Sequence, residues 1–476
     1  MAASWILSLR EGVVISEGEA GEVVIAGPSS RVVLRGLGPA TLTALQRLAP
    51  PGMPEAKLAE SVLEGDGPDA LARWYYALQH LAQRGNLLVS AHAGKDRLAT
   101  LVPTAPSFVF AGGTTVPERP CVLSRFAYLH RGDGEMVLES PRSFARVLLH
   151  DDRASALVHA LARPTSADEL GGRVLGLPGA AAGQLLGLFA AAGMVREVDQ
   201  GGTDEDTDPA LRSWEFHDLL FHSRSREGRH DHPVGGTYRL AGTLDPPPAV
   251  KPVAAAETIE LYRPDLAKLA REDPPFAEVQ ERRRSIREYA DEPMTDRQLG
   301  ELLYRVARVK DLGEWEVTTP AGPVRMQSTS RPYPAGGGLY ELEFYAVVSA
   351  CRGLTPGLYH YDPLGHRLGR LAGPNADTET LLASAGSAAG VERERVQVLL
   401  ILAARFPRLA WKYESLAYAL TLKHVGVVYQ TLYLAATAMG LAPCAVGGGD
   451  SDCFARAAGL DYYAETAVGE FLLGSR

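Results

Sequence analysis

Two nearly continuous apolar segments constrain the fold of this 476-residue chain more than any other feature. They are LEFYAVVSA, from Leu342 to Ala350, and VQVLLILAA, from Val396 to Ala404. Each has the length of a strand and is too short to span a bilayer, and a strand without polar alternation is expected to be buried on both faces. Because predicted helices alternate with these strands from about Ile259 onward, we expect a layered α/β or α+β domain.

A long segment without proline, between Tyr413 and Leu441, is apolar around most of its circumference. Such a helix is expected to be buried on nearly every side. The sequence therefore predicts a helix that packs against its own sheet and against a second subunit.

The first 200 residues repeat one pattern twice. In each copy a segment with apolar residues at every second position, 22–34 or 135–149, precedes two helices and a short apolar strand. The predicted helices are Thr41–Leu48 and Trp74–Arg84 in the first copy, and Ala154–Ala162 and Gln184–Ala192 in the second. Gly85 and Gly193 are suited to cap the second helix of each copy. This pattern is typical of winged-helix-like units, here 1–105 and 106–200.

The helices of these units carry no cluster of basic residues, which argues against DNA binding. A unit of this kind can instead add a peptide strand at a sheet edge. Two structural spacers are the alternative.

The segment GGTDEDTDP, 201–209, is acidic and free of apolar residues, so we interpret it as a linker. The next segment, WEFHDLLFHSRSREGRHDHP, holds four histidines, but His217 and His222 lie about 140° apart on a helix. No cysteine or carboxylate pattern completes a ligand set, so we expect no metal site. We predict a helix with an aromatic face and a proline-rich crossover, LDPPPAVKP. The predicted linker is 201–255 and the last domain 256–476.

Composition limits the classes of partner. The net charge of −9 argues against nonspecific binding to nucleic acid, and no segment predicts membrane insertion. The four cysteines have neither redox nor zinc spacing, so we expect a reducing, cytoplasmic setting. The start, MAASWILSLREG, lacks the basic and apolar regions of a signal peptide.

The segment RRSIREY, 283–289, is the strongest chemical signal. Guanidinium groups bind phosphate oxygens bidentately, and a serine hydroxyl adds a donor. Farther along lie SRPYPAGGG, an adjacent Lys-Tyr pair, and LAPCAVGGGD. Glycines in such loops let backbone amides come close to a flat ring.

In this order, and with the terminal LLGSR, these motifs resemble the flavin-dependent nitroreductase superfamily. Within it the chain is most similar to the SagB-type dehydrogenases, the azoline oxidases of ribosomal peptide biosynthesis. The resemblance implies an α+β fold in which a nitroreductase-like FMN domain, with a mixed sheet flanked by helices, follows two winged-helix-like units. It also implies a homodimer that binds FMN at the subunit interface.

The resemblance assigns FMN contacts to eleven positions. They are Arg283, Arg284, Ser285, Arg287, Ala335, Gly336, Gly337, Val446, Gly447, Gly448 and Arg476. Ala335 stands where many relatives have serine, so only a backbone contact is expected there.

Lys412 and Tyr413 are the candidates for proton chemistry. Both groups titrate near 10 when unperturbed, but a lysine cation favours tyrosinate and burial favours neutral lysine. We therefore expect both pKa values to be drawn toward neutrality, and either residue to act as the base. His424 could line the substrate cleft, but an interior histidine with satisfied hydrogen bonds is the simpler interpretation.

The leading function is an FMN-dependent dehydrogenase that oxidises thiazoline or oxazoline rings of a modified precursor peptide to thiazole or oxazole. Its N-terminal units would bind the peptide or a partner cyclodehydratase. One alternative is an NAD(P)H-dependent nitro or quinone reductase of the same fold. Another is a peptide-binding scaffold without enzymatic activity.

Overall fold

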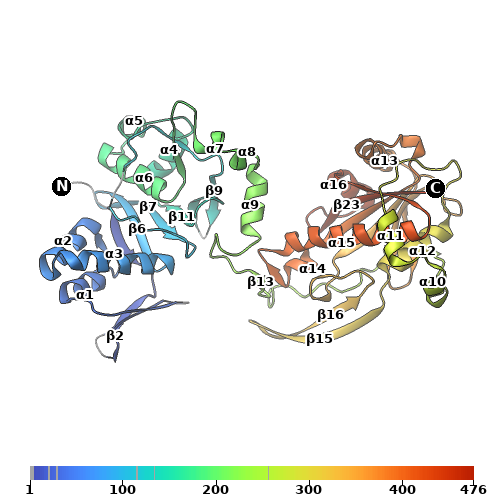
Figure 1. Ribbon diagram of the computed structural model, residues 1–476, viewed down its shortest axis with the longest axis horizontal. Helices are drawn as coiled ribbons and strands as arrows, with labels where there is room; N and C mark the ends of the chain where they lie inside the picture. Colours follow the sequence, from blue (N-terminus) through green and yellow to red (C-terminus); the bar gives the residue numbers. More distant parts are fainter. Residues whose placement is uncertain (1–4, 20–21, 28–29, 114–115, 133, 256) are drawn as a thin grey trace. The chain divides into compact units, whose positions relative to one another are not determined.

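A computed structural model describes residues 5–19, 22–27, 30–113, 116–132, 134–255 and 257–476 (Figure 1). The chain divides into two compact units, Met1–His232 and Pro233–Arg476. Residues 1–4 of the segment without signal-peptide features, and 28–29 of the first predicted strand pattern, lie outside the described residues. The division into four domains remains a prediction.

The first unit is built around a seven-stranded sheet in which every pair is antiparallel. Its order is β5 (Met53–Pro54), β1 (Ile6–Leu9), β6 (Leu87–Ala93), β7 (Asp96–Pro103), β11 (Ala145–Leu149), β10 (Glu135–Glu139) and β9 (Tyr128–Gly132). Strands β7 and β11 come from different copies of the repeated pattern and pair directly. The two copies therefore share one sheet and one apolar core.

Each copy contributes helices near the predicted positions. A three-stranded sheet of β2 (Val14–Glu17), β3 (Val23–Ala26) and β4 (Arg31–Leu34) precedes α1 (Pro39–Gln46), α2 (Glu55–Asp66) and α3 (Pro68–Gln83). The second copy has α4 (Asp152–Ala160), α5 (Ala167–Arg173) and α6 (Gly179–Ala191), and a two-stranded sheet of β8 (Cys121–Leu123) and β12 (Val195–Glu197). Gly85 and Gly193 have φ angles of +68° and +69°, as the predicted helix caps require.

The acidic segment 201–209 differs from the expected linker because it packs onto the first unit. It forms α7 (Asp204–Thr207) and the start of α8 (Pro209–Arg212). Glu205 is buried and accepts hydrogen bonds from Ser124 Oγ at 2.6 Å, Arg125 N at 2.9 Å and Arg142 Nη1 at 2.5 Å. These long-range donors compensate the burial of a charge, which the local composition does not reveal. The predicted helix follows as α9 (Phe216–Arg224).

The second unit contains another seven-stranded sheet. Its order is β14 (Glu257–Glu260), β19 (Arg367–Ala372), β18 (Gly357–Asp362), β17 (Leu342–Val348), β20 (Val398–Arg405), β23 (Glu465–Gly474) and β22 (Ala442–Val446). The two apolar segments became the adjacent strands β17 and β20, and both are buried along their whole length.

The α+β class is confirmed, but the expectation of a mixed sheet is wrong in one respect. All pairs of the described strands in this sheet are antiparallel. A short connection such as the one between β18 and β19 favours this arrangement, because a parallel pair needs a long crossover.

Helices cover this sheet on both faces (Figure 1). The helices of this unit are α10 (Leu266–Glu272), α11 (Phe276–Arg282), α12 (Asp296–Ala307), α13 (Ala376–Ala389), α14 (Phe406–Ala410), α15 (Ala417–Ala438) and α16 (Ser451–Ala458). A hairpin of β15 (Asp311–Thr319) and β16 (Gly322–Ser330) forms a separate two-stranded sheet. None of the helices that the structure describes is long and apolar enough to cross a membrane.

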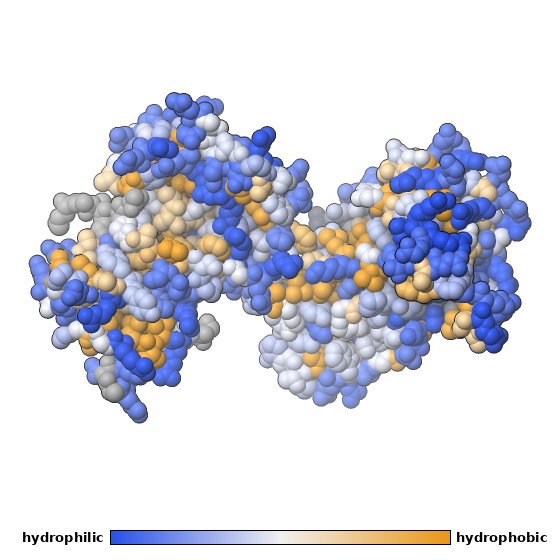
Figure 2. Space-filling model, in the orientation of Figure 1, coloured by the Kyte–Doolittle hydropathy of each residue, from blue (hydrophilic) through white to orange (hydrophobic). Residues whose placement is uncertain are grey.

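Within a single copy of the protein, helix α15 is less buried than its apolar sequence predicts. Val428, Leu432 and Ala436 are fully buried in the core of the second unit. Tyr418 and Leu422 remain 47% and 41% exposed, and apolar side chains follow α15 along the surface (Figure 2). Because the second unit covers only part of the helix, an apolar surface is left open.

The proline-rich crossover is held by donors from other segments. Trp411 Nε1 donates to Leu244 O at 2.8 Å, Arg408 Nη1 to Pro247 O at 2.5 Å, and Arg405 Nη2 to Ala249 O at 3.0 Å. Prolines have no N–H group, so this segment cannot join a strand through regular pairing. Its carbonyls are satisfied by side chains instead.

We predict that Glu205→Ala destabilises the first unit by about 3 kcal/mol, because Ser124, Arg125 and Arg142 lose a buried acceptor. Urea unfolding of the full chain measures this change. The matched control is Glu64→Ala, at an exposed position of α2. Equal unfolding midpoints for the two variants would contradict the role of Glu205.

Candidate functional site

Lys412 and Tyr413 lie between two helices of the second unit. Lys412 follows α14, and Tyr413 begins the short strand β21 (Tyr413–Glu414), which pairs with β13 (Gly235–Gly236). The sequence placed this pair at the start of the long helix, but α15 begins at Ala417. The difference arises because Ser415 adopts a φ angle of +62°, which ends the strand and delays the helix.

Both side chains point toward one glycine turn, Gly336–Gly338. Gly337 has a φ angle of +61°. A Cβ atom at Gly337 would lie 2.6 Å from Lys412 Nζ and 2.9 Å from Tyr413 Oη. A glycine is therefore required at position 337 for two reasons, the backbone conformation and the close approach of two polar groups.

Strained backbone surrounds this turn. Tyr238, Tyr340 and Ser415 have φ angles of +55°, +46° and +62°, and Tyr238 N donates to Lys412 O at 3.1 Å. A non-glycine residue in this region costs about 1–3 kcal/mol, and such residues gather at functional sites. No sequence pattern indicated Tyr238, which comes from the crossover region.

Aromatic rings surround the amino group of Lys412. Lys412 Nζ lies 5.1 Å from the ring centroid of Trp315 on β15, 5.2 Å from that of Tyr413 and 5.9 Å from that of Tyr238. Among the described residues no carboxylate forms an ion pair with Lys412. Within the described residues, these ring faces are therefore the groups that favour the ammonium form.

Burial shifts the two candidate groups in opposite directions. It lowers the pKa of Lys412, because it disfavours the ammonium form. It raises the pKa of Tyr413, because it disfavours tyrosinate, and the neighbouring Tyr238 adds to this effect. The expectation that both pKa values approach neutrality holds for Lys412 and is wrong for Tyr413. Lys412 is thus the better base, and Tyr413 remains a phenol that can donate a hydrogen bond.

His424 and Glu341 support the glycine turn. Gly336 N donates to His424 Nε2 at 2.9 Å, and His424 Nδ1 lies 2.7 Å from Glu341 Oε1. The interpretation of His424 as an interior histidine with satisfied hydrogen bonds is confirmed. Glu341 is completely buried and was not identified from the sequence, because it lies among apolar strand residues.

A second cluster forms where RRSIREY meets β22. Ser285 Oγ and Tyr433 Oη are 2.7 Å apart, and Ala445 N donates to Tyr433 Oη at 2.8 Å. The Arg283 guanidinium lies 5.2 Å from the Tyr433 ring centroid. Arg284 and Arg287 are exposed, and in the described part of the chain no carboxylate pairs with any of these arginines. Their donors are available to an anion such as a phosphate.

The segment after β22 leaves room for a flat group. Gly447 and Gly448 are exposed, and a Cβ atom at either position would meet no atom within 4 Å. Val446 O accepts a hydrogen bond from Tyr429 Oη at 3.4 Å. Gly449 packs directly against the Glu470 carboxyl group.

Arg476 belongs to neither cluster. It is exposed, and its neighbour Ser475 accepts from Ala290 N at 3.3 Å and donates to Glu292 O at 2.5 Å. The chain terminus therefore lies beside the segment that follows RRSIREY, and no described contact joins Arg476 to the arginines of that motif.

The predicted residues thus form two clusters that α15 connects. Its first half contacts Gly336 through His424, and its second half contacts Ala445 and Ser285 through Tyr433. These two positions are about 13 Å apart along the helix axis, at 1.5 Å per residue. Gly336, Gly337, Lys412 and Tyr413 belong to the first cluster, and Arg283, Ser285 and the start of Val446–Gly448 to the second.

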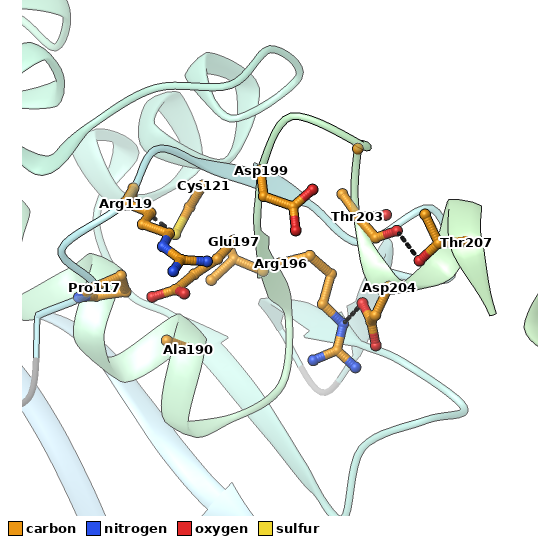
Figure 3. Close-up of a pocket in the computed structure, with 12 residues that line it drawn as sticks. Pro117, Arg119, Cys121, Ala190, Arg196, Glu197, Asp199, Thr203, Asp204 and Thr207 are labelled. Atoms are coloured by element: carbon orange, nitrogen blue, oxygen red, sulfur yellow. Dashed lines mark hydrogen bonds and ion pairs between the residues drawn. The ribbon is translucent and has the colours of Figure 1, made fainter.

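A separate pocket in the first unit contains none of the predicted residues (Figure 3). It is lined by Cys121, Glu197 and the loop after β12, and Arg196 of β12 pairs with Asp204 of α7 at 3.3 Å. Burial, with a smaller effect of Glu197, raises the pKa of Cys121 to about 11. Its thiol is therefore protonated near neutral pH and is a poor nucleophile.

Three family models match successive parts of the chain. The ThcOx helix-turn-helix domain matches residues 1–111, the cyanobactin oxidase ThcOx matches 121–231, and the nitroreductase family matches 281–474. The last match includes every predicted site residue except Arg476.

Two curated relatives match part of this chain. MJ1384 of Methanocaldococcus jannaschii, whose name assigns it to the nitroreductases, is 29% identical over 191 residues, or 40% of this chain and 85% of that protein. The microcin B17-processing protein McbC of Escherichia coli is 30% identical over 122 residues, or 24% of this chain and 43% of McbC. The match to McbC thus spans less than half of that protein.

Solved structures give weaker likenesses. The E. coli microcin synthetase McbBCD complex with truncated pro-MccB17 is 20% identical, with a TM-score of 0.34, and the match covers 54% of this chain and 91% of that chain. A nitroreductase from Desulfovibrio desulfuricans in complex with FMN is 14% identical, with a TM-score of 0.26, over 42% of this chain and 86% of that chain.

We predict that Glu470→Gln weakens the dependence of stability on pH. Burial raises the pKa of Glu470 from its ordinary 4.5 to about 7. Between these values the unfolded chain releases a proton that the folded chain retains, so the stability contributed by Glu470 is present below pH 4 and is lost as the pH rises through about 7. The variant should be more stable than the natural chain at pH 8.5, by at most about 3 kcal/mol.

Urea unfolding at pH 5 and pH 8.5 tests this prediction. Glu316→Gln, at an exposed position of β15, is the matched control. A stability gain for Glu470→Gln that is the same at both pH values would show that Glu470 does not titrate in this range.

Proposed function

Because the chain belongs to the SagB-type branch of the nitroreductase superfamily, we propose that it is an FMN-dependent dehydrogenase that oxidises azoline rings of a ribosomally made precursor peptide. The products would be thiazoles or oxazoles. The observation that carries this proposal is the convergence of Lys412 Nζ and Tyr413 Oη on Gly337, which places an amine whose pKa is lowered by burial beside a phenol.

The residues present fit FMN. Arg283, Arg284 and Arg287 offer guanidinium donors without carboxylate partners in the described chain, next to the Ser285 hydroxyl. These groups would hold the phosphate. The open space at Gly447 and Gly448 would let backbone amides approach the ring, and the Gly336–Gly338 turn would do so near Lys412. We retain Ala335 as a backbone contact and Arg476 as a phosphate contact from the chain terminus.

The chemistry requires one proton acceptor from the protein. Conversion of an azoline to an azole removes two electrons and two protons, and bound FMN would accept the electrons as a hydride from the ring β-carbon. The other proton leaves the α-carbon, which is acidified by its neighbouring carbonyl. We assign this proton to Lys412, since burial favours its neutral form. Tyr413, held as a phenol, would orient the ring by hydrogen bonding. Dioxygen would restore the oxidised cofactor.

The apolar surface of α15 supports a homodimer. Tyr418 and Leu422 on α15 are 47% and 41% exposed, and Phe276 on α11 is 68% exposed. A second copy that covers this surface would also complete the burial that the sequence predicts for the helix. We propose that FMN binds at this subunit interface.

The first unit would bind the peptide or a partner cyclodehydratase. Its three-stranded sheet, β2–β3–β4, has edges to which an extended peptide can add a strand. The name of McbC describes a peptide-processing protein, which supports a peptide substrate. All four cysteines are buried and free, which fits a reducing, cytoplasmic setting.

An NAD(P)H-dependent reductase is the second candidate. The match to MJ1384 over 85% of that protein favours it, because the name of that protein assigns it to the nitroreductases. Such a reductase, however, gives no role to the buried Lys412 or to the first unit.

We predict that Lys412→Ala lowers the turnover of an azoline-containing peptide by about 10²- to 10⁴-fold while FMN stays bound, because the proton acceptor is lost. In the natural protein kcat/KM should rise with pH as Lys412 becomes neutral, since its base form is the active one. Tyr413→Phe should lower turnover less. Lys95→Ala, on an exposed turn, is the control. If Lys412→Ala and Lys95→Ala turn over equally, the proposed base is wrong.

We also predict that Gly337→Ala is far more damaging than Gly338→Ala. Both glycines have positive φ angles, of +61° and +67°, so the backbone strain is similar. A Cβ atom at Gly338 would lie 3.5 Å from its nearest neighbour, whereas one at Gly337 would displace Lys412 and Tyr413. The ratio of the two turnover rates isolates this displacement, and a ratio near one would contradict it.

A further inference from the structure

Two buried titratable side chains support the glycine turn, and neither has a described contact with the end groups of Lys412 or Tyr413. His424 on α15 is 6% exposed, and Glu341, directly before β17, is 0% exposed. His424 Nδ1 and Glu341 Oε1 are 2.7 Å apart. Removing a carboxylate from water costs several kcal/mol, so this arrangement requires a compensating role.

The hydrogen bonds fix the tautomer of His424. Nε2 accepts the N–H of Gly336 at 2.9 Å, so this nitrogen carries no proton. Nδ1 therefore carries the proton and donates it to Glu341 Oε1. A carboxylate behind a histidine selects the tautomer and ring orientation in the same way at metal sites.

The turn has few other attachments at its start. Its internal bonds, from Gly338 N to Ala335 O and from Leu339 N to Gly336 O, are both long, at 3.3 Å. Its end is held by Arg408 Nε, which donates to Leu339 O at 2.9 Å. Among the described residues, the bond from Gly336 to His424 is thus the short contact that fixes the first residue of the turn.

The next residue of the turn is Gly337, on which Lys412 and Tyr413 converge. We propose that Glu341 and His424 are positioning residues, which hold the Gly336–Gly338 turn at the place that brings Lys412 and Tyr413 together. This inference rests on the proposed function for its effect on turnover. Its structural part, the anchoring of the turn, stands without it.

The matched control is a second buried pair, which lies in the seven-stranded sheet of the second unit. His360 Nε2 and Glu343 Oε2 are 3.1 Å apart, and both residues are at most 2% exposed. Neither residue contacts the glycine turn in the described structure. His360→Asn therefore removes a buried histidine without removing the hydrogen bond that holds the glycine turn. It shows how much of the effect of His424→Asn comes from a general loss of stability and how much from a displaced turn.

Two substitutions of His424 each keep one of its two hydrogen bonds, the one to Glu341 or the one from Gly336 N. Asparagine places an amide near Nδ1 and can serve only Glu341, whereas glutamine reaches the position of Nε2 and can accept the N–H of Gly336. His424→Asn should lower kcat on the order of 10²-fold, as displaced groups do, with the KM for the peptide unchanged. His424→Gln should recover most of this loss. Glu341→Gln, which removes the charge but keeps an acceptor, should lie between them.

Hydrogen exchange of the full-length protein, followed by mass spectrometry of the segment 335–340, gives the readout independent of activity. We expect faster exchange there in His424→Asn, natural rates in His360→Asn, and near-natural rates in His424→Gln. The acid limb of the pH–rate profile should also move to higher pH in His424→Asn. Lys412 would leave its half-buried place between Trp315, Tyr238 and Tyr413, and its pKa would rise.

Natural exchange rates in His424→Asn would overturn the anchoring role, whatever the activity. An equal loss of kcat in His424→Asn and His360→Asn would show that His424 and Glu341 contribute to stability only and do not position the turn. If the natural protein does not oxidise azolines at all, the proposed function fails, while the exchange experiment still decides on the anchor.

Discussion

The site depends on one backbone position that has no side chain. Gly337 adopts a left-handed conformation, and the ends of Lys412 and Tyr413 lie in the space that a side chain at this position would need. The two side chains come from one segment and the turn from another, about 75 residues earlier in the chain. The chemistry of the pair is therefore set by how firmly the rest of the unit holds this turn.

Buried charge provides that support. Arg408 is completely buried and donates to Leu339 O, Pro247 O and Gln327 O, so it links the turn to the crossover and to the hairpin. Burial and the neighbouring Arg405 and Arg331 lower the pKa of Arg408 to about 10. Burying a guanidinium that carbonyls satisfy in this way is costly, but its donors connect three segments that also share an apolar cluster, which includes Leu339, Met326 and Leu240. Together with His424, it fixes both ends of the turn.

The elements that could be predicted are those whose own residues determine them. The apolar segments gave strands β17 and β20, and glycines after α3 and α6 gave caps with positive φ angles. The motifs from Arg283 to Gly448 were found from resemblance, and the structure gathers them into two clusters.

Features that depend on distant partners could not be predicted. The segment around Glu205 reads as a linker because its composition is polar, yet its donors lie about 60–80 residues away. The β15–β16 hairpin carries apolar residues at alternating positions, but the contact of its Trp315 with Lys412 joins residues far apart in the chain and leaves no local pattern. Glu341 and Tyr238 contribute through hydrogen bonds and backbone strain, which leave no local pattern.

The most direct test of this account is the visible spectrum of the purified protein under anaerobic conditions, before and after addition of an azoline-containing peptide, with NADPH in a parallel sample. An FMN-dependent azoline dehydrogenase should show a bound flavin band that the peptide bleaches and NADPH does not. Bleaching by NADPH alone would contradict it in favour of a reductase, and a protein without a flavin band would contradict FMN binding itself.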